Sequence, residues 1–327
     1  MKADRWLKTE KEVFEYTKDL QSVHNESRSW ISHARTHSKN TFSPTAHSPF
    51  QLFSITTLYL WLGILAFIPL LLVLITSFLS HTDSHLLIWR WTLSNYHRLL
   101  SDAYFTILMR SLKLAFVSTL LCLFIGYPTA FIIARMGRYW KFLLLLLLII
   151  PFWTSSLIRT YAMLTLLKTK GLLNTTLLWL GLTHHPLQIL YTNAAVLIGS
   201  VYNLLPFMIL PLFVNIEKLD NRLIEAARDL GAKRVRLFLR IILPLTLPGI
   251  LAGSLLVFLP AMTLFYIPAL LGGAKSLLLG NLIQDQFLVL RDWPDGAATS
   301  VILTLLMLLL IAIYRRFTKN KYHRTWL

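Results

Sequence analysis

The chain has 327 residues, of which 55% are hydrophobic and only 14% are charged, and its formal net charge is +17. Soluble domains carry about a quarter charged residues, whereas here the apolar residues gather in blocks of about twenty, the length that crosses a bilayer. The composition therefore excludes a soluble globular protein. The basic residues lie in short segments between the apolar blocks, which indicates membrane topology rather than nucleic-acid binding.

Residues 1–50 precede the first apolar block, and we predict that they form a cytoplasmic extension. Trp6, Val13 and Leu20 recur every seven residues, which favours a short amphipathic helix over residues 4–20. Residues 21–50 are rich in Ser, His, Thr and Asn, a composition typical of a flexible linker, and their histidines lack the spacing of metal ligands. Because the first apolar block begins near Leu52, we expect no secretory signal peptide.

Six apolar blocks are long enough to span the membrane, and they cover residues 54–79, 112–134, 142–166, 194–216, 245–270 and 297–315. With a cytoplasmic N-terminus, the segments 135–141, 217–244 and 316–327 are also cytoplasmic. These carry about twice as many Lys and Arg residues as the segments on the other side, as the positive-inside rule requires. We therefore predict an all-α polytopic membrane protein with six transmembrane helices and both termini in the cytoplasm.

The third and fourth spans hold polar side chains for which we expect a role. Arg159 lies inside the third span, where an ionisable residue is functional by default. We favour a gate-stabilising or interhelical role, with snorkelling to the outer interface and substrate contact as alternatives. Asn203 is a buried amide that needs partners, and we expect it to satisfy carbonyls freed by a kink at Pro206. Tyr161 and Tyr202 are candidates for a translocation path, although packing explains most aromatic residues within spans.

The segment after the fourth span, residues 217–244, is the longest and most charged of the predicted cytoplasmic connections. Asp220 or Asn221 can cap a helix start, and Gly231 sits where a C-terminal cap would. We predict a helix, a glycine break, and a second helix that runs from Lys233 and ends at Pro244. The first helix should have an apolar face made of Leu219, Leu223, Ala227 and Leu230 with Ile224 beside it, and the second one made of Val235, Phe238, Ile241 and Ile242.

On the first of these helices the small residues Ala226 and Ala227 would let a partner surface approach closely, while a soluble connection without a partner is the alternative. The spacing of Glu225-Ala226-Ala227, Gly231 and Ile241-x-Leu243-Pro244 resembles the EAA loop of ABC importer permeases. In that family the loop forms a coupling helix that docks in a cleft of the cytoplasmic ATPase. The resemblance therefore implies ATPase coupling for Glu225, Ala226, Ala227, Gly231, Ile241, Leu243 and Pro244.

Between the fifth and sixth spans, Asp285 lies in an otherwise apolar run, residues 280–288, which could re-enter the helix bundle. Asp285 therefore joins the candidates for the translocation path, as does Tyr266, an aromatic residue within the fifth span. For Asp285 the alternative is a solvated outer loop. Asp292, Trp293 and Pro294 are expected to form a rigid turn that contacts a binding protein.

The wider resemblance is to spermidine/putrescine permeases of the PotB type, and it covers residues 60–315. The long N-terminal extension departs from that family's pattern, and so does Met163, which stands where a tryptophan is expected. The Met puts in doubt any aromatic contact at that point of the path. The segments that carry the resemblance are SLIRTYA (156–162), GLLNTTLLWLG (171–181), LLPFMILPL (204–212), EKLD (217–220), EAARDLGA (225–232), LPLTLPGILAG (243–253), GGAK (272–275) and RDWPDGAATS (291–300).

This resemblance implies the type I ABC importer permease fold and four regions along the chain. These are the extension 1–50, the first transmembrane helix with the first periplasmic loop (51–111), the importer transmembrane domain (109–315) and a basic cytoplasmic tail (316–327). It also implies a polyamine cargo, a place in the bacterial inner membrane, and three partners: a cytoplasmic ATPase dimer, a second permease subunit and a periplasmic binding protein.

The sequence has no G-x-x-x-x-G-K-[ST] motif, the signature of a phosphate-binding loop, so we expect ATP hydrolysis in another chain. We expect no catalytic residue, cofactor or metal site in this one, and the single cysteine, Cys122, can form no internal disulfide. Two alternatives stay open. The same machine could import iron, thiosulfate, phosphonate or an opine, or the chain could be an ATP-independent transporter or channel, for which the spaced EAA pattern has no purpose.

Overall fold

The computed structural model describes residues 49–82, 85–273 and 277–322. The predicted helix over 4–20 and the linker over 21–48 lie outside the described residues. The chain divides into two units, Met1–Pro69 and Leu70–Leu327. The described part of the first unit is the beginning of helix α2 (Pro49–Thr76), which has no charged residue along its length and continues into the second unit.

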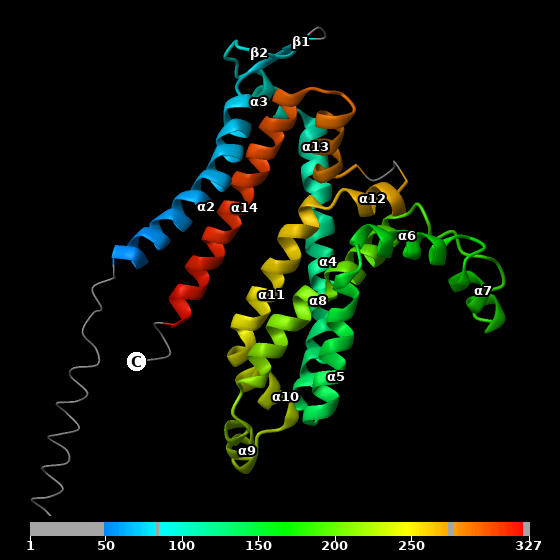
Figure 1. Cartoon of the computed structure of the whole chain (residues 1–327). Coiled ribbons are helices and arrows are strands. Elements are labelled where there is room, and N and C mark those ends of the chain that lie inside the picture. The colour runs from blue at the N-terminus through cyan, green and yellow to red at the C-terminus, as the bar shows by residue number, and fades with distance from the viewer. Residues whose placement is uncertain (1–48, 83–84, 274–276, 323–327) are drawn as a thin grey trace, which may run out of the picture. The chain divides into compact units, whose positions relative to one another are not determined.

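Helices dominate the second unit (Figure 1). After α2, the strands β1 (Ser80–Thr82) and β2 (His85–Ile88) form a short antiparallel hairpin. The elements that follow are α3 (Ser94–Leu99), α4 (Asp102–Arg135), α5 (Arg138–Ile149), the 3-10 turn η1 (Ile150–Trp153), α6 (Ser156–Leu167), α7 (Leu172–Trp179), α8 (Asn193–Glu217), α9 (Asn221–Asp229), α10 (Arg234–Leu237), the π-helical stretch η2 (Phe238–Ile242), α11 (Leu243–Thr263), α12 (Tyr266–Leu271), α13 (Leu279–Leu288) and α14 (Trp293–Tyr322).

Within the described residues, five helical segments are long and apolar enough to cross a membrane: 55–76, 102–135, 193–217, 234–263 and 293–316. A sixth crossing would be made by residues 138–153 and 156–179 together, which are bent by 97° at the break between them. Five of the six predicted spans thus correspond to long helices, and the predicted all-α polytopic fold is confirmed. The short β hairpin is a minor addition to it.

The third predicted span, 142–166, is not one continuous helix. Helix α5 ends at Ile149, the turn η1 follows, and Thr154 has an extended backbone before α6 begins. Pro151 contributes to the break, because it has no N–H to donate to the Leu147 carbonyl in a continuous helix. Arg159 and Tyr161 therefore belong to a separate helix, α6, beyond the bend.

The fifth predicted span, 245–270, is also divided. Helix α11 ends at Thr263, Leu264 has an extended backbone, and α12 is a short separate helix. Pro268 gives the physical reason, because in a continuous helix it would have to donate an N–H to Leu264 and cannot. Tyr266 consequently stands at the start of α12 rather than at the end of a membrane helix.

Helices α4, α8 and α11 pack together at the centre of the second unit (Figure 1). Met208 of α8 is fully buried there. A Cβ added to Gly126 of α4 would lie 3.0 Å from its Cγ, and one added to Gly253 of α11 would lie 2.8 Å from its Sδ. Small residues thus let the three helices approach closely around Met208, as is common in membranes. The Tyr127 and Thr246 hydroxyls share a hydrogen bond of 3.1 Å between α4 and α11.

Candidate functional site

The loop between α8 and α11 begins with helix α9, whose two ends are capped as the sequence predicts. The Asp220 side chain accepts a hydrogen bond of 2.9 Å from the Arg222 N–H, which satisfies one free donor of the first turn. At the other end Gly231 has φ +80°. The Gly231 N–H donates to the Arg228 carbonyl at 2.8 Å and the Ala232 N–H to the Ala227 carbonyl at 3.0 Å. This pair of bonds is the Schellman motif.

The apolar face of α9 differs from the predicted one. Ile224 and Ala227 are buried, whereas the side chains of Leu223 and Leu230 are 52% and 88% exposed. Ile224 and Ala227 form a small cluster with Leu237 of α10 and Ile242 of η2, against which Phe131 of α4 also packs. Because α9 packs against the helix that follows it, contact with Leu237 and Ile242 determines which face of α9 is buried. Of the small pair, only Ala226 is exposed.

The second helix of the loop also departs from the prediction. Val235 is 70% exposed, and Leu237 takes its place in the buried cluster. Pro244 does not end this helix, because η2 runs directly into α11 with Pro244 in its first turn. Pro244 has no N–H to donate to the preceding turn, and that turn is the π-helical stretch η2. Such stretches are frequent at functional sites. Ile241, Leu243 and Pro244 thus lie on one continuous helical connection.

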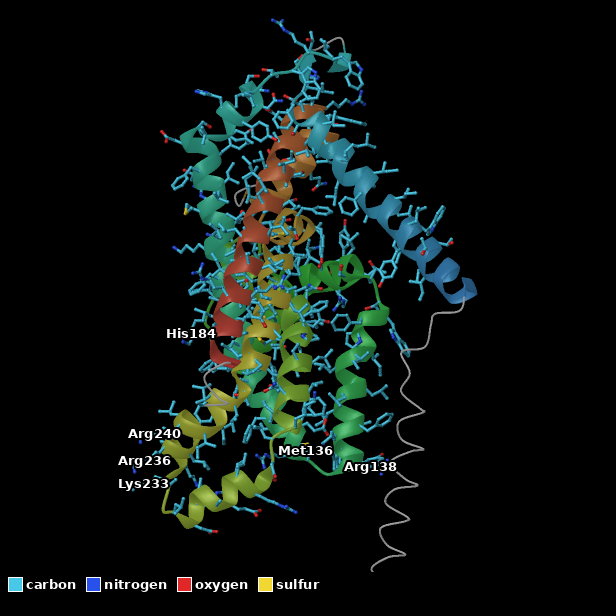
Figure 2. The ribbon with its side chains drawn as sticks, turned by 90° about the vertical axis from the view of Figure 1, so that its left-hand side faces the viewer. Met136, Arg138, His184, Lys233, Arg236 and Arg240 are labelled. Atoms are coloured by element: carbon cyan, nitrogen blue, oxygen red, sulfur yellow. The ribbon has the colours of Figure 1, made fainter. Side chains whose placement is uncertain are left out.

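The outer surface of this loop combines apolar and basic side chains. Glu225, Ala226 and Leu230 are exposed on α9 and around its C-cap. Lys233, Arg236 and Arg240 project from the following helix, near the end of the molecule at which Arg138 also lies (Figure 2). We call these exposed residues of 223–240 the loop surface. It lies outside the apolar middle of the long helices, so its exposed leucines and valine face water in the isolated chain.

Arg159, predicted to stabilise a gate, makes an aromatic contact and leaves one atom unsatisfied. Its guanidinium carbon lies 5.5 Å from the ring centroid of Phe152, a cation–π distance. Phe152 in turn packs edge-to-face on Phe207 of α8 with centroids 5.1 Å apart. The Arg159 Nε is buried and has no hydrogen-bond partner among the residues that the structure describes. The contacts therefore join the bend between α5 and α6 to α8.

Asn203 does not play the predicted part at Pro206. Its Nδ2 donates to the Gly199 carbonyl at 3.0 Å, whereas the carbonyl freed by Pro206 is that of Tyr202, four residues earlier. Within the described part of the chain, the Asn203 Oδ1 is buried and has no hydrogen-bond partner. Asn203 is therefore tied within α8 and keeps one unsatisfied acceptor.

The four candidates for the translocation path are not brought together by any described contact. Tyr161 and Tyr202 are 57% and 43% exposed, so neither is explained by packing within this chain. Tyr266 packs edge-to-face on Phe265, with ring centroids 5.6 Å apart. Asp285 lies in the last turns of α13 and is partly buried, so the run 280–288 is a helix packed on α14, α11, α12 and α4.

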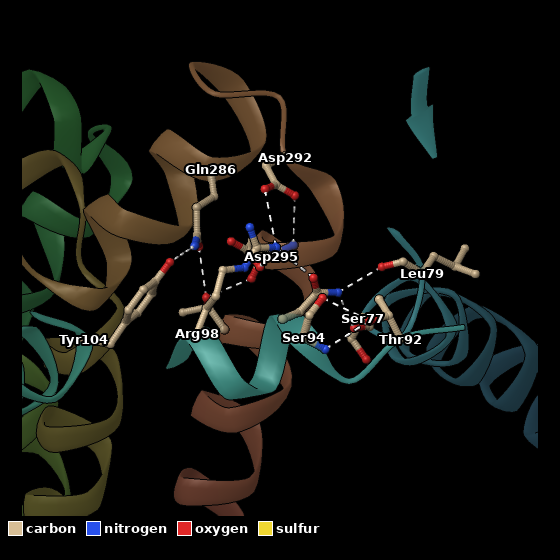
Figure 3. A network of polar contacts seen from close by, with 11 residues as sticks. Ser77, Leu79, Thr92, Ser94, Arg98, Tyr104, Gln286, Asp292 and Asp295 are labelled. Carbon is tan, nitrogen blue, oxygen red and sulfur yellow. Dashed lines mark hydrogen bonds and ion pairs between the residues drawn. The ribbon is translucent and has the colours of Figure 1, made fainter. Parts of the chain in front are cut away.

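A polar network near the N-terminus of α14 is one that the sequence did not predict (Figure 3). The Arg98 guanidinium lies 2.7 Å from Asp295 Oδ1 and 3.9 Å from Asp292 Oδ2. It also donates to Asn95 Oδ1 at 2.8 Å, and Asn95 Nδ2 donates to the carbonyls of Ser77 and Leu79, both at 2.9 Å. The network therefore ties α3 and the segment after α2 to α14.

The same region continues through Gln286. Its Nε2 donates to the Tyr104 hydroxyl at 3.0 Å, and its Oε1 accepts from the Thr299 hydroxyl at 3.0 Å. Asp292, predicted to begin a rigid turn, instead caps α14 by accepting the Asp295 N–H at 3.2 Å. The motif Asp-x-Pro could have signalled this helix start, whereas the pairing of Arg98 with Asp295 joins residues 197 positions apart.

Comparisons with known proteins agree with the arrangement of these helices. The family model of the binding-protein-dependent transport system inner membrane component matches residues 126–325. The chain is 53% identical over 272 residues to the spermidine/putrescine transport system permease protein PotB of Salmonella typhimurium strain SL1344, covering 83% of this chain and 95% of that protein. It is 53% identical over 265 residues to the PotB protein of Escherichia coli K12, covering 81% and 96%.

Among solved structures, a bacterial ABC transporter involved in the import of the acidic polysaccharide alginate has a chain with the same fold. The TM-score is 0.67 with 17% sequence identity, and the match covers 82% of this chain and 95% of that one. This likeness confirms the predicted type I importer fold. The family model covers residues 126–325, and the relatives are identical at 53% of the aligned residues. The protein therefore belongs to the inner membrane components of binding-protein-dependent transport systems.

Proposed function

We propose that this chain is a permease subunit of an importer that carries a polyamine across the bacterial inner membrane and is driven by a separate ATPase. The observation that carries the proposal is the loop surface, where Ala226, Leu230 and Val235 are exposed beside several cations. Apolar residues grouped at a water-exposed surface mark an interaction site. The cargo is supported by the relatives, which are named as permeases of a spermidine/putrescine transport system.

The fold suggests how a displacement of α9 is transmitted to the membrane-spanning helices. Ile224 and Ala227 hold α9 against Leu237 and Ile242, and η2 continues into α11 without a break. A displacement of α9 by the closing ATPase would therefore move α11 with it, and α11 packs on α4 and α8. Such rigid-body transmission is a common way to switch between two states.

In this proposal each residue of the motif has a distinct part. Glu225 and Ala226 contact the ATPase dimer from the exposed side of α9. Ala227 and Ile241 hold α9 and the second helix together, and Gly231 allows the turn between them. Leu243 and Pro244 belong to the stiff connection to α11.

The rest of the assembly follows the family pattern. We propose a second permease subunit in a heterodimer and a periplasmic binding protein that delivers the cargo, with both termini in the cytoplasm. The region 109–315 is the transmembrane domain, 51–111 supplies the first helix and loop, 1–50 is the cytoplasmic extension, and 316–327 is a basic tail. The path candidates are Asp285, Tyr161, Tyr202 and Tyr266, with Arg159 and Asn203 in supporting positions, and the chain itself has no catalytic role.

The docking proposal is tested by cross-linking in the complete complex on a Cys122→Ser background. Cysteines placed by Ala226→Cys and Leu230→Cys should cross-link to the ATPase. The matched control is Leu100→Cys, which is 81% exposed in the wild type but precedes α4 at its far end. Cross-links from the control alone, or from none of the three, would contradict the docking surface.

Coupling is tested by Glu225→Lys combined with Gly231→Asp, which should leave expression intact and abolish ATP-driven uptake. Normal uptake in that variant would exclude these residues from coupling. The cargo is tested separately, by reconstituting the complex in liposomes with spermidine, putrescine, thiosulfate and Fe³⁺ in competition. We expect selective uptake of the polyamines, and selective uptake of thiosulfate or iron would replace the cargo while leaving the machine in place.

A further inference from the structure

A hollow of about 400 Å³ lies between α4, the start of α8 and the residues that precede α13. It is lined by Arg110 and Lys113 of α4 and by Asn193 of α8, with apolar side chains below them. We infer that this groove binds the headgroup of an anionic phospholipid, with its acyl chains on the apolar part. The inference concerns the lipid surroundings of the permease and does not depend on the cargo.

The two cations at the groove have no partner of their own. Both side chains are exposed. Within residues 49–82, 85–273 and 277–322, neither forms an ion pair or a side-chain hydrogen bond. They lie three residues apart on one helix, so they occupy neighbouring positions on the same face. None of the described residues that line the groove is acidic, and a phosphate would complement this charge.

Polarity changes along the groove in the same direction on both helices. On α4, Leu114 and Val117 each lie four residues, about one turn, beyond Arg110 and Lys113 toward the C-terminal end. On α8, which runs in the same direction as α4, Leu197 likewise lies one turn beyond Asn193. A charged rim above apolar walls matches a phospholipid, whereas a free inorganic anion would gain nothing from the apolar part.

The depth of the groove fits a headgroup. Lys113 precedes Arg135, the last residue of α4, by 22 positions, which correspond to about 33 Å of helix. The hydrocarbon core of a bilayer is about 30 Å thick. With Arg135 at one interface, Lys113 therefore reaches the headgroups of the opposite leaflet, on the face of the membrane away from the 217–244 loop.

The wall formed by residues 277–279 is held in place by a buried hydrogen bond. The Leu279 N–H donates to the Ser111 hydroxyl at 2.8 Å, and Ser111 is adjacent to Arg110 on α4. The N-terminus of α8 adds the positive end of a helix dipole beside Asn193. The groove is therefore a shaped and positively charged recess rather than a bare helix surface.

The test uses the complete complex in nanodiscs that contain phosphatidylglycerol and phosphatidylcholine. After detergent exchange, the retained phosphatidylglycerol per complex is measured by mass spectrometry. Two cations near a membrane surface predict about 10- to 30-fold weaker retention in Arg110→Ala with Lys113→Ala. The matched control, Lys168→Ala with Lys170→Ala, removes two exposed cations outside the groove and should retain lipid as the wild type does.

Two further arms make the result decisive. Arg110→Lys keeps the charge and should keep the lipid, and a photo-reactive residue in place of Val117 should form an adduct with phospholipid. Equal retention in the double variant and the wild type would overturn the inference. So would an adduct with the second permease or the binding protein, or displacement of the lipid by soluble glycerophosphoglycerol, which would indicate a small-anion site.

Discussion

Replacing Gly231 by alanine should loosen the α9 cap by a predictable amount. Gly231 has φ +80°, and a Cβ added there would meet nothing within 4 Å. The cost is therefore conformational alone, about 1–2 kcal/mol for an L-residue in the left-handed region. A free-energy difference of about 1.36 kcal/mol changes an equilibrium constant tenfold. Local opening of the cap should therefore become about 5- to 30-fold more frequent.

This opening can be followed by hydrogen exchange of peptides that cover residues 221–232 in the assembled complex. Gly231→Asn should exchange more slowly than Gly231→Ala, because asparagine visits the left-handed region at lower cost. The matched control is Gly137→Ala, since Gly137 has φ −61° and also has nothing within 4 Å of an added Cβ. If alanine and asparagine at position 231 exchange alike and both match the Gly137 variant, the argument from backbone conformation is refuted.

Three other changes follow from the described contacts. Leu237→Ala should lower stability by about 2–4 kcal/mol, because it leaves a cavity among Ile224, Ala227 and Ile242. Proteolysis should then cut the 217–244 loop faster. Leu239→Ala should have little effect, because Leu239 is 54% exposed. Asp295→Asn weakens the ion pair with Arg98, whose side chain is half exposed. Thermal unfolding of the purified complex should therefore show a loss of stability of about 1 kcal/mol. An equal loss in Lys141→Ala, which removes the ion pair with Glu217, would argue against a special role for the Arg98–Asp295 pair. Gly280→Ala places a Cβ in collision with the Thr263 carbonyl oxygen and should cost more than about 2 kcal/mol, which size exclusion would detect as lost assembly. Gly63→Ala should assemble normally, because a Cβ there meets nothing within 4 Å.

Local features of this chain could be read from the sequence, because they depend on neighbouring residues. The Asp220 cap, the turn at Gly231 and the existence of five long apolar helices are of this kind. The faces of α9 and α10 could not be read in the same way. Leu223 and Leu230 fit an apolar stripe as well as Ile224 does, and only the folding of α9 onto Leu237 decides between them.

Contacts between residues that are far apart in the chain could not be predicted from the sequence. Arg98 and Asp295 are each unremarkable in an outer loop and a helix start, and no pattern pairs them. The bend after α5 was hidden for another reason, since hydropathy measures apolar length and does not register what Pro151 does to the backbone. The apolar blocks therefore predicted the polytopic helical fold, and the spaced motif of residues 225–244 predicted the family. The breaks within the blocks could not be predicted from hydropathy.

The central position of Met208 has a consequence for how such a bundle can move. An unbranched thioether has three side-chain torsions and adapts to irregular spaces, and here it fills the gap left by Gly126 and Gly253. A change in the crossing of α4, α8 and α11 can be absorbed by turning these torsions, without opening a void. A β-branched residue at the same place would instead resist, because its first torsion is nearly fixed. The place where the three helices meet is thus filled by an adaptable side chain that packs against two glycines.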